Sequence, residues 1–390
     1  MSTKAFPISY WHGVPADMAS LERYQEVAEA GFSIALFGGT EEQIKKTLDW
    51  CEQAGVVGMV IDRRMPNPRV ELPDDLDERL RGITAAYSKH PALWGYFITD
   101  EPSAVEFERL RTITEKLREF DPEHPSYINL YPNYANEEQL GTTTYDEHLS
   151  RYVDEVKPPL VSYDHYCFRV DSILRGGYFE NLEAVRRNSL AAGLDFWQIV
   201  LSTPLFDWPD IGEAEFRWQV WTSLAYGAKG ISYYTYWGID DVTPHWNAII
   251  DVYGYRTNHY PIVRSVNLGV AKIGSHLLGL KSVGVRHGKG TEGADIGERY
   301  HLAERAPDRS IVGEFVREDG GAAVIVVNDD MEQGVYIPLK VAPRFTSYRN
   351  VSRVSGKPGG SRPLADGEGG KVITVTLQPG DGALIYLDTE

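Results

Sequence analysis

Two adjacent carboxylates, Asp100 and Glu101, stand where an uncharged apolar segment of the sequence meets a proline. Residues 93–98 carry no charge and predict a strand that is buried on both faces. Pro102 ends that strand, and the apolar spacing over 104–120 predicts a helix after it. Parallel α/β folds open their active sites at the carboxyl ends of strands, so the pair is typical of acid–base catalysis. The alternative is that one carboxylate caps the next helix, although a cap requires only one.

Side chains that suit a polyhydroxylated ligand follow most of the other predicted strands. Carboxylates and amides hydrogen-bond sugar hydroxyls, and aromatic rings stack on the apolar face of a pyranose, although a single aromatic more often packs in a core. Because the carboxyl ends of parallel strands meet at one rim, we expect these side chains to line a common site. The expected substrate-binding residues are Trp11, His12, Asp100, Tyr131, Asn133, Tyr163, His165, Tyr166, Asp207, Trp237, Asp240 and Trp246.

Strand-like and helix-like segments alternate eight times through residues 1–280 and give the chain the pattern of a βα repeat. The expected strands cover 7–11, 32–37, 56–61, 93–98, 127–130, 160–163, 196–201 and 230–236. The expected helices cover 21–30, 41–54, 76–88, 104–120, 145–156, 179–192, 213–226 and 259–278. Eight such units predict an α/β fold, a (β/α)8 TIM barrel that forms the catalytic domain. A doubly wound open sheet is the alternative, but the first loop lacks its glycine-rich phosphate fingerprint.

The pattern changes near residue 281, and residues 281–390 predict a separate all-β sandwich domain. Short β-rich runs at 311–316, 322–327, 335–339, 372–377 and 383–387 alternate with glycine-rich turns. We expect this domain to pack on the barrel, and it has no aromatic cluster that argues for sugar binding of its own.

The loop after the eighth expected strand, residues 238–258, is long and rich in acidic and aromatic residues. Long loops at this rim of a barrel often form lids or substrate walls. We therefore expect it to set specificity, with Trp237 or Trp246 as a platform for a sugar ring.

Other chemistries find little support in the motifs. The histidines are scattered singly without zinc-ligand spacing, and the two cysteines fit no metal or redox motif. The loop after the seventh expected strand has no glycine-rich phosphate turn, and no G-x-S-x-G elbow is present. The sequence thus predicts no metal and no cofactor, and acid–base chemistry on a sugar remains.

The composition of the whole chain limits the kinds of partner. A formal net charge of −17 argues against nucleic acid and against anionic membranes. No stretch reaches the length of a membrane span, and the first residues do not form the apolar core of a signal peptide. We expect a soluble cytoplasmic protein that binds a small carbohydrate, and a homo-oligomer remains an open possibility.

The tripeptide Asp100-Glu101-Pro102 at the end of the fourth strand resembles the N-E-P of the large retaining clan of (β/α)8 glycoside hydrolases, which includes β-galactosidases and cellulases. Runs such as Tyr163-Asp164-His165-Tyr166 are also similar to uncharacterised bacterial proteins that are labelled glycoside hydrolase or β-galactosidase-like. The clan resemblance implies that Glu101 is the general acid/base. It also implies that Asp100, in place of Asn, hydrogen-bonds the sugar's 2-hydroxyl. An ionised Asp100 and aromatic walls are expected to raise the pKa of Glu101.

The sequence departs from that clan at the seventh strand, where the resemblance implies a Glu nucleophile. Residues 196–203 end in Leu201-Ser202-Thr203 with no carboxylate, which puts double displacement in doubt. Asp164, at the end of the sixth strand, is the candidate for the second catalytic carboxylate, and the alternative is a buried Asp that holds His165 or a loop amide. Strands four and six are not adjacent, so room for a water between Glu101 and Asp164 would permit an inverting mechanism.

These observations predict a glycoside hydrolase that cleaves a small oligosaccharide or glycoside, with Glu101 as proton donor. One alternative is a non-catalytic carbohydrate-binding protein on a glycosidase scaffold, suggested by the missing carboxylate. Another is a sugar lyase or isomerase on the same barrel.

Overall fold

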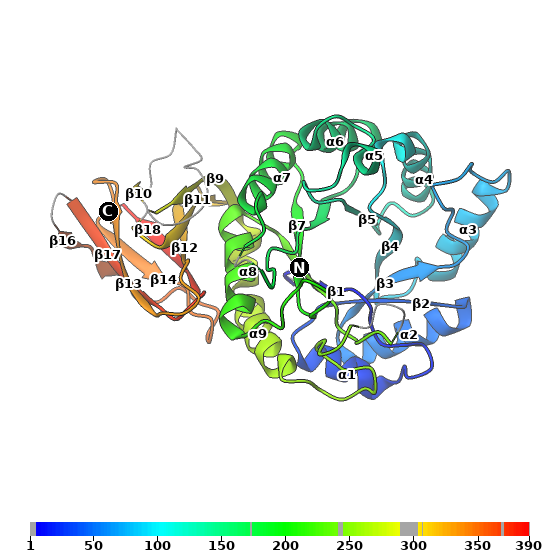
Figure 1. Ribbon diagram of the computed structural model, residues 1–390, viewed down its shortest axis with the longest axis horizontal. Coiled ribbons are helices and arrows are strands. Elements are labelled where there is room, and N and C mark those ends of the chain that lie inside the picture. The colour runs from blue at the N-terminus through cyan, green and yellow to red at the C-terminus, as the bar shows by residue number, and fades with distance from the viewer. Residues whose placement is uncertain are drawn as a thin grey trace. The chain divides into compact units, whose positions relative to one another are not determined.

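The computed structural model describes residues 5–171, 174–240, 245–288, 303–305, 307–367 and 370–389. Eight parallel strands form one sheet in the order β1-β8-β7-β6-β5-β4-β3-β2. Near the junction of its two ends, the Ser33 amide donates to the Ile8 carbonyl at 2.9 Å. Figure 1 shows the strands curving into a ring, so the predicted (β/α)8 barrel is confirmed. The strands are β1 (Ile8–Tyr10), β2 (Ile34–Gly39), β3 (Val57–Asp62), β4 (Leu93–Asp100), β5 (Ser126–Leu130), β6 (Val161–Asp164), β7 (Phe196–Leu201) and β8 (Gly230–Tyr234).

Helices follow the strands close to the positions that the apolar spacing predicts. They are α1 (Leu21–Glu29), α2 (Glu41–Ala54), α3 (Leu76–Tyr87), α4 (Phe107–Phe120), α5 (Glu137–Leu140), α6 (Tyr145–Arg151), α7 (Tyr178–Ala192), α8 (Glu213–Tyr226) and α9 (His259–Leu278). The segment expected as one helix over 104–120 begins with a 3-10 turn, and the segment expected over 145–156 changes to a π-helix at Tyr152–Val156. The short helix α5 was not expected, because four residues are too few to show a helical period.

Aromatic side chains fill part of the barrel interior. Trp94 of β4 lies 5.2 Å from Trp197 of β7 between ring centroids, and both rings contact Tyr127 of β5. Strands β4 and β7 are not neighbours in the sheet, so these rings meet across the inside of the barrel. The barrel interior is therefore a packed core and not an open channel.

The chain separates into two compact units. Pro7–Asp210 and Gly230–Tyr260 form the first, which contains all eight parallel strands, and the second contains α8, α9 and the strands from β9 onward. Helix α8 is buried on nearly all sides, and its Trp218 indole N–H donates to Asp329 Oδ1 at 2.7 Å. A domain boundary at residue 280 stays a prediction.

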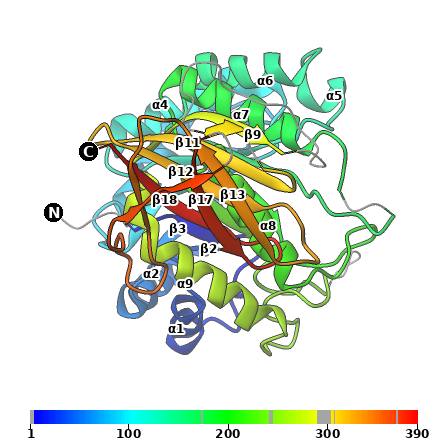
Figure 2. The same ribbon diagram turned by 90° about the vertical axis from the view of Figure 1, so that its left-hand side faces the viewer.

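The second unit carries two antiparallel sheets, as the β-rich runs predict (Figure 2). Their inward faces share one apolar core, to which Val324 and Val326 contribute from one sheet and Leu339 and Ile373 from the other. The sandwich prediction is confirmed, although β9, β10, β14, β15 and β16 were not expected. Its strands are β9 (Leu280–His287), β10 (Ala303–Arg305), β11 (Ser310–Arg317), β12 (Ala322–Asn328), β13 (Val335–Val341), β14 (Ser347–Asn350), β15 (Arg362–Pro363), β16 (Ala365–Gly367), β17 (Gly370–Leu377) and β18 (Gly382–Asp388).

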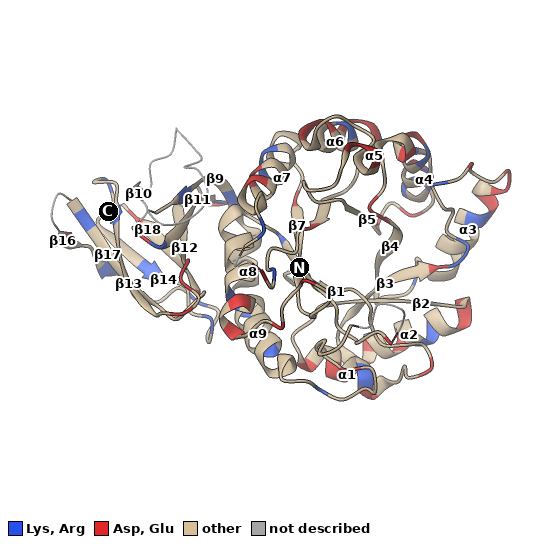
Figure 3. Cartoon of the chain, viewed as in Figure 1, with Lys and Arg blue, Asp and Glu red and all other residues tan. Residues whose placement is uncertain are grey.

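Charged residues of the first unit lie mainly on its helices and loops, while the barrel strands carry few (Figure 3). Among the helices of the described residues, none combines the length and the apolar character that crossing a membrane requires.

Candidate functional site

The two adjacent carboxylates lie at the carboxyl end of β4, as the sequence predicts. Asp100 is the last residue of the strand, and Glu101 turns out of it with a φ of +45°. A positive φ is uncommon for a residue with a side chain and is stable only where the surroundings hold it. Here the Glu101 amide donates to the Asn129 carbonyl at 2.8 Å, and the Arg69 guanidinium donates to the Asp100 carbonyl at 2.8 Å. The backbone turn directs both neighbouring side chains into one cavity.

Asn129 of β5 joins the carboxyl groups of β4 and β6. Its amide nitrogen donates to Asp100 Oδ1 at 3.0 Å and to Asp164 Oδ1 at 2.8 Å. Its oxygen accepts from the Ser162 hydroxyl, which is itself hydrogen-bonded to Tyr127. The amide is thereby fixed in orientation, and Asp100 and Asp164 are held one amide group apart.

Aromatic rings wall the cavity that contains these groups. Its volume is about 140 Å³. Tyr166 lies 4.5 Å from Trp208 and 5.2 Å from Tyr234 between ring centroids. The complete lining is Trp11, Asp100, Glu101, Asn129, Asp164, Tyr166, Ile199, Trp208 and Tyr234. Polar groups at the base and aromatic faces around them are the surfaces that one sugar residue requires.

The three carboxyls have perturbed acidity, with burial as the first cause in each. Burial and the neighbouring Asp100 raise the pKa of Glu101 to about 7. Burial, followed by the charges of Glu101 and Asp100, raises the pKa of Asp164 well above its ordinary value. The pKa of Asp100 is also raised by burial, but the Asn129 hydrogen bond and Arg69 oppose that effect. Carboxyls that repel one another's charge in a buried cavity retain protons near neutral pH, as a general acid must.

Three residues that the sequence predicts to bind substrate do not line this cavity. Tyr163 alternates with Ser162 and Asp164 along β6 and therefore points to the opposite face of the sheet. The His165 ring lies 3.0 Å from the side-chain oxygen of Asn181 and is buried. The Asn133 side-chain amide donates to the Gly177 carbonyl at 2.9 Å, so it positions the start of α7.

The expected residues near β8 lie elsewhere. His12, Trp237 and Asp240 line a second, larger cavity together with Trp11. Trp246 is 59% exposed and belongs to the lining of neither cavity. The aromatic residues that line the carboxylate cavity are Trp11, Tyr166, Trp208 and Tyr234, and the sugar-platform role of Trp237 or Trp246 stays a prediction.

Two further expected residues lie outside the cavity lining. Asp207 Oδ2 pairs with Arg169 at 2.7 Å and with Arg175 at 3.8 Å, so its charge is compensated. Tyr131 is half-buried and close enough to Glu101 that the Glu101 charge raises the pKa of its phenol, after burial. Asp241, which the sequence places in the loop after β8, lies outside the described residues.

Four lining residues were not predicted: Asn129, Ile199, Trp208 and Tyr234. Asn129 lies within a strand rather than after it, and a polar residue inside an otherwise apolar strand was the available signal. Tyr234 is the last residue of a strand that was expected to continue to 236. Trp208 lies in a loop, where the spacing of apolar residues in the sequence does not indicate which way a side chain points.

Potential metal ligands come together at one place among the described residues. Ligand atoms of Asp49, Glu52 and His90 lie within 4.8 Å of one another. They belong to α2 and to the segment before β4, at the amino ends of the strands and opposite the carboxylate cavity. The ring of His90 lies 3.1 Å from Asp49 Oδ1, and this direct contact explains why the side chains lie close together without a metal.

Comparisons with known proteins identify the scaffold. No family model matches the sequence, and no curated protein matches it. A solved structure named as a glycoside hydrolase matches 98% of this chain and 92% of its own, with a TM-score of 0.63 and 11% identity. A family 5 glycoside hydrolase from Bacteroides vulgatus matches 99% of this chain and 89% of its own, with a TM-score of 0.62 and 12% identity.

A β-galactosidase from the psychrophilic Marinomonas ef1 matches 68% of this chain at 9% identity with a TM-score of 0.49, and this chain spans only 59% of its length. At identities of 11% and 12%, the likeness to the first two structures establishes the fold alone, a barrel with a β-sandwich.

Proposed function

We propose that the protein is a glycoside hydrolase that cleaves a small glycoside or oligosaccharide, with Glu101 as the proton donor. The observation that carries the proposal is the cavity itself, where a carboxyl with a pKa of about 7 lies among aromatic walls at the barrel rim. The cavity is below the roughly 300 Å³ at which pockets for drug-sized ligands begin, so it accommodates one terminal sugar residue. That size supports exo action.

In the proposed reaction, protonated Glu101 donates its proton to the glycosidic oxygen as the bond to the anomeric carbon breaks. A water attacks that carbon from the other face of the sugar and gives its proton to an ionised carboxylate. The end of β7 offers no carboxylate, since Leu201 is followed by Ser202, whose hydroxyl donates to the Thr235 carbonyl. The proposal is therefore a direct, inverting displacement.

Two residues compete for the role of the second carboxylate. Asp164 is the candidate from the sequence, but complete burial favours its protonated form. Asp100 accepts a hydrogen bond from Asn129 and is near Arg69, both of which favour its ionised form. A base must be ionised at the working pH, so the electrostatics favour Asp100, and Asp164 then hydrogen-bonds the sugar.

A non-catalytic sugar-binding protein is the second candidate. The observation that favours it is the missing carboxylate after β7, at Ser202 and Thr203. Such a protein would retain the aromatic walls and lose turnover.

The test is proton NMR of the full-length protein with a panel of aryl glycosides and short oligosaccharides, with and without EDTA. The proposal predicts release of one sugar residue, unaffected by EDTA, with the inverted anomer appearing first. Binding without turnover would favour the second candidate. An unsaturated or isomerised product would identify a lyase or isomerase, and a retained anomer would exclude direct displacement.

A further inference from the structure

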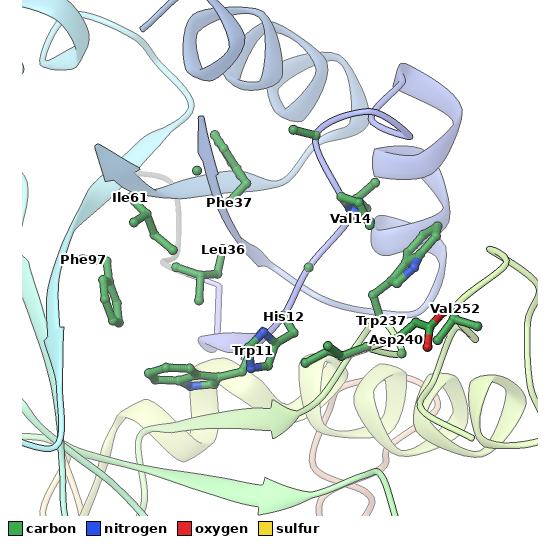
Figure 4. A pocket seen from close by; sticks show the side chains of 16 residues that line it. Trp11, His12, Val14, Leu36, Phe37, Ile61, Phe97, Trp237, Asp240 and Val252 are labelled. Atoms are coloured by element: carbon green, nitrogen blue, oxygen red, sulfur yellow. The ribbon is translucent and has the colours of Figure 1, made fainter. Parts of the chain in front are cut away.

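The second cavity at the barrel rim is larger than the carboxylate cavity and has a different chemistry. Its volume is about 560 Å³, within the range of ligand pockets. Leu36, Ile61 and Phe97 project from β2, β3 and β4 toward the same space as Trp11, and Val14 and Val252 lie on its other side (Figure 4).

The lining of this cavity is mainly apolar. His12 and Asp240 are its titratable side chains among the described residues. His12 keeps contact with solvent, but partial burial, followed by the charge of His245, lowers its pKa to about 4, so its ring is uncharged at neutral pH. Asp240 is exposed. A sugar in this cavity would leave most of its hydroxyls without partners, which costs free energy, whereas a hydrocarbon ring would lose only its contact with water.

The two cavities adjoin at one side chain, since Trp11 lines both. The Trp11 ring packs edge-on against Phe97 with 5.5 Å between centroids. Phe97 belongs to β4, the strand that carries Asp100 at its end and positions Glu101. A leaving group that is protonated by Glu101 therefore has an apolar space beside it to occupy.

We propose that the apolar cavity is the leaving-group subsite and that it binds a ring-bearing hydrocarbon aglycone, not a second sugar. This inference rests on the proposed hydrolase function and narrows its substrates to glycosides of phenols and similar cyclic alcohols. Glu101 donates its proton to the aglycone oxygen, and the water hydroxyl bonds to the anomeric carbon. The remaining water proton passes to the ionised carboxylate, so the products are one free sugar and one phenol or alcohol.

The first arm of the test measures binding of 2-naphthol alone to the full-length protein by fluorescence titration. Two variants, Ile61→Asn and Val252→Asn, each introduce a polar side chain into the cavity lining. Both positions are only half-buried, so the fold should tolerate the substitutions. The control is Val105→Asn, at a position 68% exposed and outside both cavities. Thermal melting confirms folding of each. The inference predicts that either cavity variant weakens 2-naphthol binding about tenfold, since both lose apolar contact, and that the control does not.

The second arm compares phenyl and 2-naphthyl glycosides of a sugar that the wild type hydrolyses, because these phenols have similar acidity and differ in apolar area. The expected kcat/KM ratio favours naphthyl by about tenfold and falls toward unity in Ile61→Asn. An unchanged ratio, or a wild type that prefers disaccharides over aryl glycosides, would overturn the inference while hydrolysis still stood. Binding of 2-naphthol that depends on Ile61, together with no hydrolysis of any glycoside, would instead reject the hydrolase and keep the ring-binding cavity. Absence of 2-naphthol binding to the wild type rejects the inference in either case.

Discussion

At the scale of single residues, the acidity of Glu101 depends on two causes that can be separated. Burial is the larger cause and the charge of Asp100 is the second. Because the proton donor must be protonated, kcat/KM of the wild type is expected to fall as the pH rises through about 7.

Asp100→Asn removes the second cause and should lower the pKa of Glu101, since an amide keeps the shape of the side chain but not its charge. The shift can be followed by the carboxyl carbon signal of labelled Glu101 in NMR, which does not depend on activity. The same variant should lose about 10²- to 10⁴-fold in kcat if Asp100 is the base. An unchanged Glu101 titration would show that the two carboxyls do not interact.

Asp164→Asn tests the free-energy cost of ionising a buried carboxyl group. The folded-state pKa of Asp164 is raised, so below its unfolded-state pKa near 4 the wild type loses no stability from this group. As the pH rises from there toward the folded-state pKa, the free energy of unfolding falls by up to about 1.4 kcal/mol per unit. Asn cannot ionise and still accepts from Asn129. We therefore expect the variant to be more stable than the wild type at pH 7, with a difference that shrinks toward pH 4. Urea unfolding at both pH values measures this, and equal stability at pH 7 would contradict the assigned burial effect.

Residue identity and position after a strand sufficed to predict Asp100, Glu101 and Asp164 in one cavity. They did not suffice for Tyr163 or His165, because the face to which a strand-end residue points depends on the register of a barrel. A sequence read alone gives that register only to within a residue, and one residue reverses the face.

At the scale of elements, the barrel strands were predictable because each is an apolar run between turn residues. The interior contacts across the barrel were not, since they join side chains on strands far apart in the sequence. Close contacts between neighbouring strands were not predictable either, as at Gly95 of β4, where a Cβ would lie 2.3 Å from the Pro125 carbonyl oxygen. The close approach of β4 and β5 therefore depends on a residue that the sequence marks only as a glycine within a strand.

Gly95→Ala should lower the free energy of unfolding by at least about 1–3 kcal/mol, the usual cost of overpacking, and should reduce activity through the displaced end of β4. The matched control is Gly82→Ala in α3, where the nearest atom to the new Cβ is Arg64 Nη1 at 3.7 Å. That change should raise stability by up to about 1 kcal/mol, since alanine favours a helix. Chemical denaturation compares the pair, and a neutral Gly95→Ala would contradict the strand contact.

At the scale of the whole molecule, composition and the change of pattern near residue 281 predicted a barrel followed by a sandwich. They did not show that α8 and α9 group with the sandwich. Helix α8 reads as an ordinary barrel helix by its length and place. Buried side chains occur on nearly all of its faces, however, and a helix of that kind requires partners all round. The Trp218 contact with Asp329 and the Arg217 contact with the Pro379 carbonyl supply some of them.

A fragment ending at residue 280 should therefore fail to fold, because it leaves α8 without the strands β11, β12 and β18. Circular dichroism, tryptophan fluorescence and size exclusion of the fragment, with the full chain as reference, test this. A monomeric fragment with cooperative unfolding would instead show that the barrel is an independent domain.

The central claim, that Glu101 is the proton donor of a glycoside hydrolase, is tested most directly by Glu101→Gln on substrates that share a sugar and differ in leaving-group acidity. A poor leaving group requires the proton and an activated one, such as a dinitrophenolate, does not. The account predicts that kcat/KM falls about 10²- to 10⁴-fold for the poor leaving group, much less for the activated one, and that the variant loses the decline of activity above pH 7. Equal losses on both substrates, or a variant as active as the wild type on the poor one, would contradict the assignment of Glu101.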